Sequence, residues 1–250
     1  MSRARSEVRS RETMSAAIRT AHRYHDWVFG SFASHLRRGP TLEVGSGHGL
    51  YAQRLLERVG EVVVSDIDPT AIANIREQLG DDARVRYLLM DGVDPAKLGK
   101  KVANVLLLNV LEHIEDDAGL LVHCAEILED GGTLVVFAPA FARLYGEMDR
   151  QAGHFRRYER AALGALIERA GFRVLELRLF NTLGFFGWWA NKWLGSGIDS
   201  RATNLQIRLY DAVIPLVRHL DGVLPVGQSL VAVAEWRGDS SKTGSEASGR

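Results

Sequence analysis

Short apolar, β-branched segments alternate with stretches of helical periodicity in this chain. Strands are predicted at 41–44, 61–65, 84–90, 102–108 and 133–137, with helices at 50–59, 69–79 and 115–128, the last ended by a Gly131-Gly132 turn. The 102–108 segment is almost wholly apolar, which is typical of a strand covered on both faces. This alternation predicts an α/β fold with a parallel sheet and right-handed crossovers. Ligands bind such sheets outside the carboxyl ends of the strands, so the residues directly after each strand are the candidates for function.

A glycine-rich turn, Glu43-Val-Gly45-Ser46-Gly47-His-Gly49, follows the first predicted strand. Glycine permits positive φ angles and lets a ligand approach the backbone closely. A dinucleotide fingerprint requires G-x-G-x-x-G, but position 50 is leucine and the third glycine falls one place early. The turn therefore predicts a ligand site and disfavours a pyrophosphate cradle.

An acidic turn, Asp66-Ile67-Asp68, follows the second predicted strand. An acidic side chain at this place can accept hydrogen bonds from a ribose diol. We assign that role to Asp66, because Asp68 precedes Pro69 and is expected to cap the following helix. The alternative for Asp66 is a solvated turn residue.

Polar residues also follow the third and fourth predicted strands. Asp91-Gly92 follows the third, where a carboxylate can accept a hydrogen bond from the exocyclic amine of adenine. Asn109, Glu112 and His113 follow the all-apolar fourth strand, so they are expected to face the ligand crevice.

Together, these motifs resemble class I S-adenosylmethionine-dependent methyltransferases in order and spacing from about residue 40 to residue 138. The resemblance implies a Rossmann-like, seven-stranded, mostly parallel sheet with helices on both faces and an antiparallel last strand. Segments 172–179 and 229–236 match the last two strands. The implied cofactor is S-adenosyl-L-methionine. The residues implied to hold it are Glu43, Gly45, Ser46, Gly47, Asp66, Ile67, Asp91, Gly92 and Asn109.

The segment after the fifth predicted strand, 144–158, is dense in functional side chains and is expected to overhang the same crevice. It resembles a Gly-His-Tyr-Arg-Arg-Tyr segment of a subset of bacterial class I methyltransferases, with Phe155 in place of the first tyrosine. His154 is the candidate general base, and His113 and Asp149 are further catalytic candidates. Candidate substrate contacts here are Tyr145, Arg156, Arg157 and Tyr158. The alternative role for His154 and Arg157 is to tie the loop to the sheet.

A long helical and aromatic insertion, 181–228, separates the last two predicted strands. Its first part contains Trp188 and Trp189, and 200–220 has the spacing of an amphipathic helix with a bend near Pro215. Three roles remain open: a lid packed on the core, the wall of an acceptor pocket, or a membrane-surface contact through 183–194. The segment 13–38 is predicted to form a cap helix from which Tyr24 and Trp27 contact the acceptor.

Composition narrows the function classes. Lys plus Arg and Asp plus Glu both total 31, and this zero net charge argues against a nucleic-acid partner. A single cysteine, Cys124, excludes a disulfide framework and a Cys-rich zinc site. The eight histidines are scattered without an H-x-x-x-H pair, which predicts no metal site. The polar first residues lack the apolar core of a signal peptide, so a cytoplasmic location is expected.

The sequence therefore predicts one methyltransferase domain over 13–237, between disordered tails at 1–12 and 238–250. Its halves are a cofactor-binding part, 40–138, and a substrate part, 139–237. The expected function is methyl transfer to an O, N or C atom of a small molecule at an apolar, aromatic-lined site, by a monomer or homodimer. The alternatives are a lipid- or glycan-linked acceptor at a membrane surface, a nicotinamide-dependent dehydrogenase, and a catalytically silent binding module.

Overall fold

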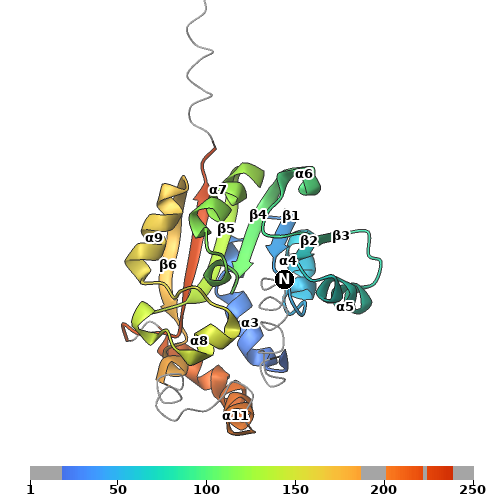
Figure 1. Cartoon of the computed structure of the whole chain (residues 1–250). Helices are drawn as coiled ribbons and strands as arrows, with labels where there is room; N and C mark the ends of the chain where they lie inside the picture. The colour runs from blue at the N-terminus through green and yellow to red at the C-terminus, as the bar shows by residue number, and fades with distance from the viewer. Residues whose placement is uncertain (1–18, 187–200, 222–223, 239–250) are drawn as a thin grey trace, which may run out of the picture.

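The computed structural model describes residues 19–186, 201–221 and 224–238, so Trp188, Trp189 and nearly all of both predicted tails lie outside the described residues. Its centre is a seven-stranded sheet in the order β3-β2-β1-β4-β5-β7-β6 (Figure 1). Only β7 runs against its neighbours. The strands are β1 (Gly39–Val44), β2 (Gly60–Asp66), β3 (Val85–Leu89), β4 (Val102–Leu108), β5 (Leu128–Pro139), β6 (Phe172–Phe180) and β7 (Ser229–Trp236).

Helices cover both faces of this sheet, so the predicted fold class is confirmed. One core cluster joins the sheet to three helices, α3 (His22–Gly30), α4 (Ala52–Val59) and α5 (Pro69–Leu79). The cluster on the opposite face includes side chains of α6 (Pro95–Leu98), α7 (Asp117–Ile127) and α9 (Arg160–Arg169). The strand β4 is buried at every position, as its unbroken apolar sequence predicts.

Local sequence signals set the bounds of α5. The Asp68 carboxylate accepts a hydrogen bond from the Thr70 backbone N–H at 2.6 Å, and Pro69 occupies the first helical position. Gly80, with φ of +70°, follows the last helical residue. The predicted cap, start and end of this helix are all confirmed.

The predicted turn after α7 is wrong. The helix ends at Ile127 and β5 begins at the next residue, where Leu128 pairs with Val102. The pairing resumes only at Thr133, opposite Asn104, so the two glycines lie inside a bulge of β5 rather than in a turn. Gly131, with φ of +71°, has a backbone conformation that suits this irregularity.

The predicted N-terminal cap helix is shorter in the described residues than expected. Helix α3 ends at Gly30, and a separate 3₁₀ turn, η1 (Ala33–His35), follows it. Between them Phe32 is fully buried and contacts Phe29, with ring centroids 5.5 Å apart. Burying that ring takes the chain out of the helical path.

The insertion contains the predicted amphipathic helix, α11 (Arg201–Val217), which includes Pro215. However, its most regular apolar stripe faces solvent, with exposed fractions from 39% to 77% for Leu205, Leu209, Val213 and Leu216. The opposite side packs on α3, because Ile214 is buried and Asp211 accepts a hydrogen bond from the Tyr24 backbone N–H at 2.9 Å. Helical spacing therefore predicted the helix but not its buried side.

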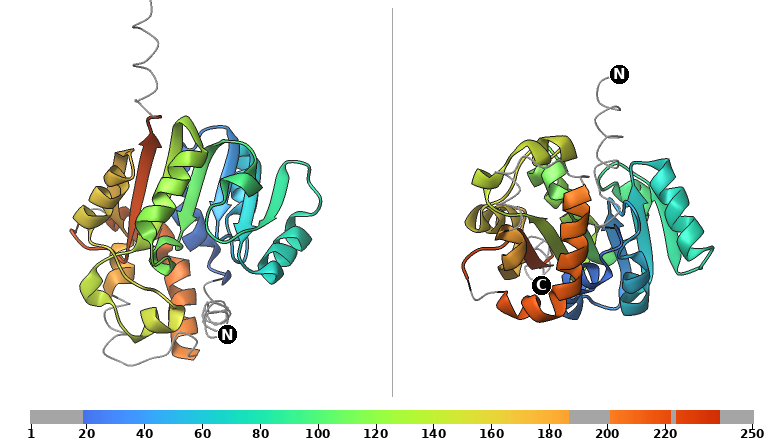
Figure 2. Two further views of the ribbon diagram at one scale, coloured as in Figure 1. Left: turned by 45° about the horizontal axis from the view of Figure 1, so that its top comes forward. Right: turned by 90° about the horizontal axis from the view of Figure 1, so that it is seen from below.

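The carboxyl ends of the parallel strands meet at one edge of the sheet, the lower one in Figure 1. Three helices lie at this edge: α3, α8 (Glu147–Ala152) and α11. In the view from below, α11 passes across it (Figure 2). Among the described residues, none of the helices combines the length and apolarity needed to cross a lipid bilayer.

We expect Asn104→Ala to lower the free energy of unfolding by about 1–3 kcal/mol, because it leaves buried polar groups without partners. The Asn104 side chain is fully buried on β4, donates to Thr41 Oγ1 at 2.7 Å and accepts from the Arg37 backbone N–H at 2.9 Å. Urea unfolding measures the change. The exposed Val122→Ala on α7 is the control, expected to stay within about 0.5 kcal/mol of the parent. Equal midpoints for both variants would contradict this role.

Candidate functional site

The glycine turn after β1 has the backbone conformation that its sequence predicts. Gly45, Gly47 and Gly49 have φ angles of +63°, +53° and +69°. A Cβ atom at Gly45 would lie 2.9 Å from the Val110 side chain, which follows β4. The turn therefore packs tightly against the end of the neighbouring strand, and only glycine fits there.

Asp66 joins this turn to the end of β2. Its side chain is buried, and its two oxygens accept hydrogen bonds from the Gly47 backbone N–H at 2.8 Å and the Asp68 backbone N–H at 2.9 Å. A carboxylate has further lone pairs, so these bonds leave acceptor capacity for a ligand. The predicted ribose partner thus lies directly against the glycine turn.

Glu43 provides an unsatisfied buried group beside the same turn. Its side chain is 2% exposed, and Oε2 has no hydrogen-bond partner among the described residues. Burial raises its pKa to about 8, a hydrogen bond with Ser46 opposes the rise, and the charge of Asp66 adds to it. A cationic or hydrogen-bonding ligand would satisfy this oxygen, and this makes the turn a fitting site for an amine.

The remaining predicted cofactor residues follow the ends of β2, β3 and β4. Ile67 and Asp91 are exposed, and Gly92 has φ of +62°. Asn109 has φ of +54°, which is uncommon for a residue other than glycine. Its backbone N–H donates to the Phe137 carbonyl at 2.8 Å, so the chain turns sharply at Asn109 into the short helix η2 (Leu111–His113).

A buried carboxylate organises the segment after β5. Asp149, on α8, is fully buried and accepts hydrogen bonds from His154 Nδ1 at 2.9 Å, Arg157 Nε at 2.8 Å and the Gly146 backbone N–H at 2.9 Å. Burial acts to raise its pKa, but the His154 and Arg157 interactions outweigh burial and lower it. Asp149 is therefore an ionised positioning group.

The other side chains of this segment make contacts within the protein. Arg156 donates to Asp117 Oδ2 at 2.8 Å, and the Tyr158 hydroxyl donates to the same oxygen at 2.9 Å. The Tyr145 hydroxyl donates to the His154 carbonyl at 2.8 Å. These bonds hold the segment to α7 and to itself. Arg157 also donates to the carbonyl of Ala140, directly after β5, at 3.3 Å, and this bond fits the alternative role of tying the loop to the sheet.

The two acceptor candidates on α3 also lie within packed surroundings. The Trp27 ring packs on Phe180 at the end of β6, with centroids 4.3 Å apart. The Tyr24 hydroxyl is near Asn181, and burial raises its pKa to about 12. Asn181 in turn accepts a hydrogen bond from Tyr210 of α11. Tyr24 therefore links α3 to the insertion, whereas Trp27 links α3 to the end of β6.

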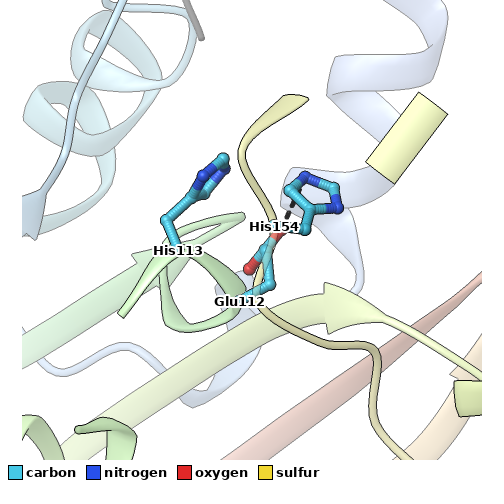
Figure 3. Close-up of side chains that lie close together, drawn as sticks. All are labelled: Glu112, His113 and His154. Atoms are coloured by element: carbon cyan, nitrogen blue, oxygen red, sulfur yellow. Dashed lines mark ion pairs between the residues drawn. The ribbon is translucent and has the colours of Figure 1, made fainter. Parts of the chain in front are cut away.

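Three ionisable side chains meet where η2 and the loop after α8 approach each other. Figure 3 shows the Glu112 carboxylate beside the rings of His113 and His154. Glu112 Oε1 lies 4.0 Å from His154 Nε2, and the two ring centroids are 4.7 Å apart. Burial raises the pKa of Glu112 to about 7, opposed by His154, whereas burial and then His154 lower the pKa of His113 to about 4.

Together these three side chains form a group that could hold a metal ion, since one ligand atom from each lies within 4.8 Å of the others. The scattered histidines, without an H-x-x-x-H pair within one helix, predict no metal site. A signal was nevertheless present: Glu112 and His113 follow one strand, and His154 follows the adjacent one.

The family model of a methyltransferase domain matches residues 17–177. The chain belongs to this methyltransferase family. This membership agrees with the family that the sequence motifs predict. It does not test the resemblance of segment 144–158 to the Gly-His-Tyr-Arg-Arg-Tyr segment of some bacterial members.

Among curated proteins, the chain is 27% identical over 172 residues to a probable S-adenosylmethionine-dependent methyltransferase of Mycolicibacterium smegmatis, covering 66% of this chain and 62% of that protein. A similar probable methyltransferase of Mycobacterium tuberculosis is 28% identical over 117 residues, which are 47% of this chain and 42% of the relative. The chain thus matches less than two thirds of the length of each of these relatives.

Among solved structures, the fold is similar to N-methyltransferase NodS from Bradyrhizobium japonicum in complex with S-adenosyl-L-homocysteine. The TM-score is 0.55 at 15% identity, covering 88% of both chains. At this identity the similarity concerns the fold alone.

We expect Asp149→Asn to destabilise the protein by about 3–5 kcal/mol, because it leaves the buried Arg157 guanidinium without its counter-charge. The control is Glu147→Gln on the same helix, whose exposed ion pair with Arg150 is expected to contribute little to stability. Denaturant unfolding at neutral pH compares the two. A loss for Asp149→Asn no larger than for the control would show that Asp149 does not hold the segment.

Proposed function

We propose that this chain binds S-adenosyl-L-methionine at the carboxyl ends of β1 to β4 and transfers its methyl group to an oxygen or nitrogen atom of a small molecule. Family membership supports methyl transfer over the hydride transfer of a nicotinamide-dependent enzyme. The zero net charge favours a small acceptor over a nucleic acid.

The unpaired Oε2 atom of buried Glu43 carries the cofactor part of this proposal. Beside the glycine turn, this carboxylate suits the ammonium group of the cofactor's methionine portion, which would pair its charge. Asp66 would accept hydrogen bonds from the ribose hydroxyls, and Asp91 with Gly92 would border the adenine. Asn109 would lie close to the sulfur.

When bound, the cofactor supplies a methyl group on a positively charged sulfur, which is already a strong electrophile. The protein's task is then mainly to align the acceptor and exclude water, which can contribute about 7–11 kcal/mol of the barrier reduction. A hydroxyl or ammonium acceptor must also lose a proton. Glu112, His113 and His154 lie after the ends of β4 and β5 and are the groups available for this task.

For the cofactor site, we expect S-adenosyl-L-homocysteine, which carries the same ammonium group, to bind in calorimetry, whereas NAD does not. Below pH 8 its affinity should fall by up to about tenfold per pH unit, because Glu43 has a pKa of about 8 and must lose its proton to pair with a cation. Binding at neutral pH should therefore release a proton, which is measured as a dependence of the heat on the buffer.

The matched variant is Glu43→Gln, which imitates the neutral carboxyl group. We expect it to weaken binding at pH 9 by about 10- to 100-fold and to abolish the proton release. Binding of NAD alone would overturn the proposed function. Unchanged proton release in Glu43→Gln would remove Glu43 from the site.

A second candidate acceptor is a lipid-linked molecule at a membrane surface, because the apolar stripe of α11 is exposed. The four side chains of the stripe lie on the side opposite to the one that packs on α3. Leu183 and Phe186 are also exposed, and they follow Asn181, which contacts Tyr210 of α11. A row of exposed apolar side chains such as the α11 stripe is typical of a surface that binds a partner or a bilayer.

Charge favours an anionic lipid surface as the occupant of this stripe. Arg208 lies beside the stripe on α11 and is exposed. An exposed cation next to an apolar helix face suits the headgroup and acyl boundary of an anionic bilayer.

We expect the full chain to co-sediment with phosphatidylglycerol-containing vesicles and less with pure phosphatidylcholine vesicles. The double variant Leu209→Gln/Leu216→Gln should lose this binding, because both exposed side chains would no longer enter the bilayer. Val122→Gln, on an exposed position of α7, is the control and should bind as the parent does. No sedimentation of the parent with anionic vesicles would remove the membrane candidate.

A further inference from the structure

The space between Glu112, His113 and His154 is bounded by groups that bind metal ions. Glu112 and His113 are held by η2, directly after β4, and His154 follows α8. One oxygen and two ring nitrogens lie within 4.8 Å of one another, and Figure 3 shows the carboxylate with an imidazole on either side of it. We propose that these three side chains bind a divalent transition-metal ion of the Zn²⁺ class.

The unpaired state of Glu112 is independent evidence for a ligand. Its side chain is fully buried, and neither carboxylate oxygen has a hydrogen-bond partner among the described residues. The His154 ring nitrogen, at 4.0 Å, is too distant to donate a hydrogen bond. A buried carboxylate without donors is costly, and a bound cation would supply the missing interaction for both oxygens.

Asp149 orients His154 for metal binding. An ionised carboxylate only accepts hydrogen bonds, so the 2.9 Å contact requires that His154 Nδ1 carries the proton. The lone pair is then on Nε2, the atom nearer Glu112. Arg157 donates to the same Asp149 oxygen at 2.8 Å and balances its charge. This carboxylate–histidine pair is the arrangement that commonly supports metal-binding histidines.

The donor set indicates which ions fit. Two imidazole nitrogens and one carboxylate suit Zn²⁺, Co²⁺ or Fe²⁺, whereas Mg²⁺ and Ca²⁺ prefer oxygen ligands. Tetrahedral Zn²⁺ with bonds of about 2.0–2.1 Å places its ligand atoms about 3.4 Å apart. Binding of Zn²⁺ must therefore bring these ligand atoms closer together than their present separations of up to 4.8 Å.

Three protein ligands leave one position open on a four-coordinate ion. Because His113 and His154 are partly exposed, the cluster is open to solvent on their side. An oxygen ligand such as a hydroxyl or carboxylate of the acceptor suits the open position. This acceptor role rests on the proposed function, whereas metal binding itself does not.

The test uses the full chain, freed of metal by a chelator and titrated with Zn²⁺ and separately with Mg²⁺ in the calorimeter. We expect one Zn²⁺ per chain, no comparable Mg²⁺ binding, and a visible absorption spectrum of bound Co²⁺ typical of nitrogen and oxygen ligands. Glu112→Gln and His154→Gln should each weaken Zn²⁺ binding by about 100-fold or more, since even supporting residues around a metal contribute 10- to 100-fold.

The matched control is His123→Gln, which removes an exposed histidine of α7 and should leave Zn²⁺ affinity unchanged. Thermal unfolding of the metal-free variants checks that each is folded, and the Co²⁺ spectrum of the parent tests the site without any variant. Absence of Zn²⁺ binding, equal affinity in Glu112→Gln, or equal binding of Mg²⁺ would overturn the proposal. S-adenosyl-L-homocysteine titrated into the same metal-free samples tests the proposed function separately, so either result can fail alone.

Discussion

The β1 and β4 strands pair in parallel, yet the chain leaves their ends toward opposite faces of the sheet. After β1 it enters α4, whose core cluster lies on one face, and after β4 it enters η2 and α7, which belong to the other. This divergence leaves a place outside the carboxyl ends of the two strands that neither of these two connections fills. The glycine turn, Asp66 and the Glu112 cluster all border that place, so the site depends on this single feature of the strand order.

Three buried carboxylates at this edge, Asp149, Glu43 and Glu112, differ in how their charge is satisfied. Asp149 receives three donors, including the Arg157 guanidinium, and its pKa falls below the usual range. Glu43 and Glu112 are equally buried but have unpaired oxygens, and burial raises the pKa of each. The first pattern is that of a supporting group. The second is that of groups whose partners come from outside the chain, which is why the cofactor and the metal ion are proposed at these two residues.

Much of the fold could be predicted from local sequence. The start and end of α5 follow from Asp68, Pro69 and Gly80, and the glycine turn follows from its spacing. Two local sequence patterns gave wrong predictions, because tertiary contacts outweigh the local preferences at those places. The Gly131-Gly132 pair accommodates a bulge against β4 instead of a turn, because pairing with Val102 begins earlier than the β-branched run suggests. The apolar stripe of α11 faces outward, because Tyr210 and Ile214 pack on the other side.

By itself, the sequence determined which segments become strands and helices, and hence which residues follow the strands at one edge of the sheet. These features depend on contacts between residues a few positions apart, which composition and periodicity record directly. Only the tertiary structure decided which of those residues meet. His154 reaches Glu112 and His113 because β4 and β5 are neighbours and because Asp149 holds His154 in the loop that follows α8. Such a meeting depends on burial and long-range packing, which no spacing along the chain encodes.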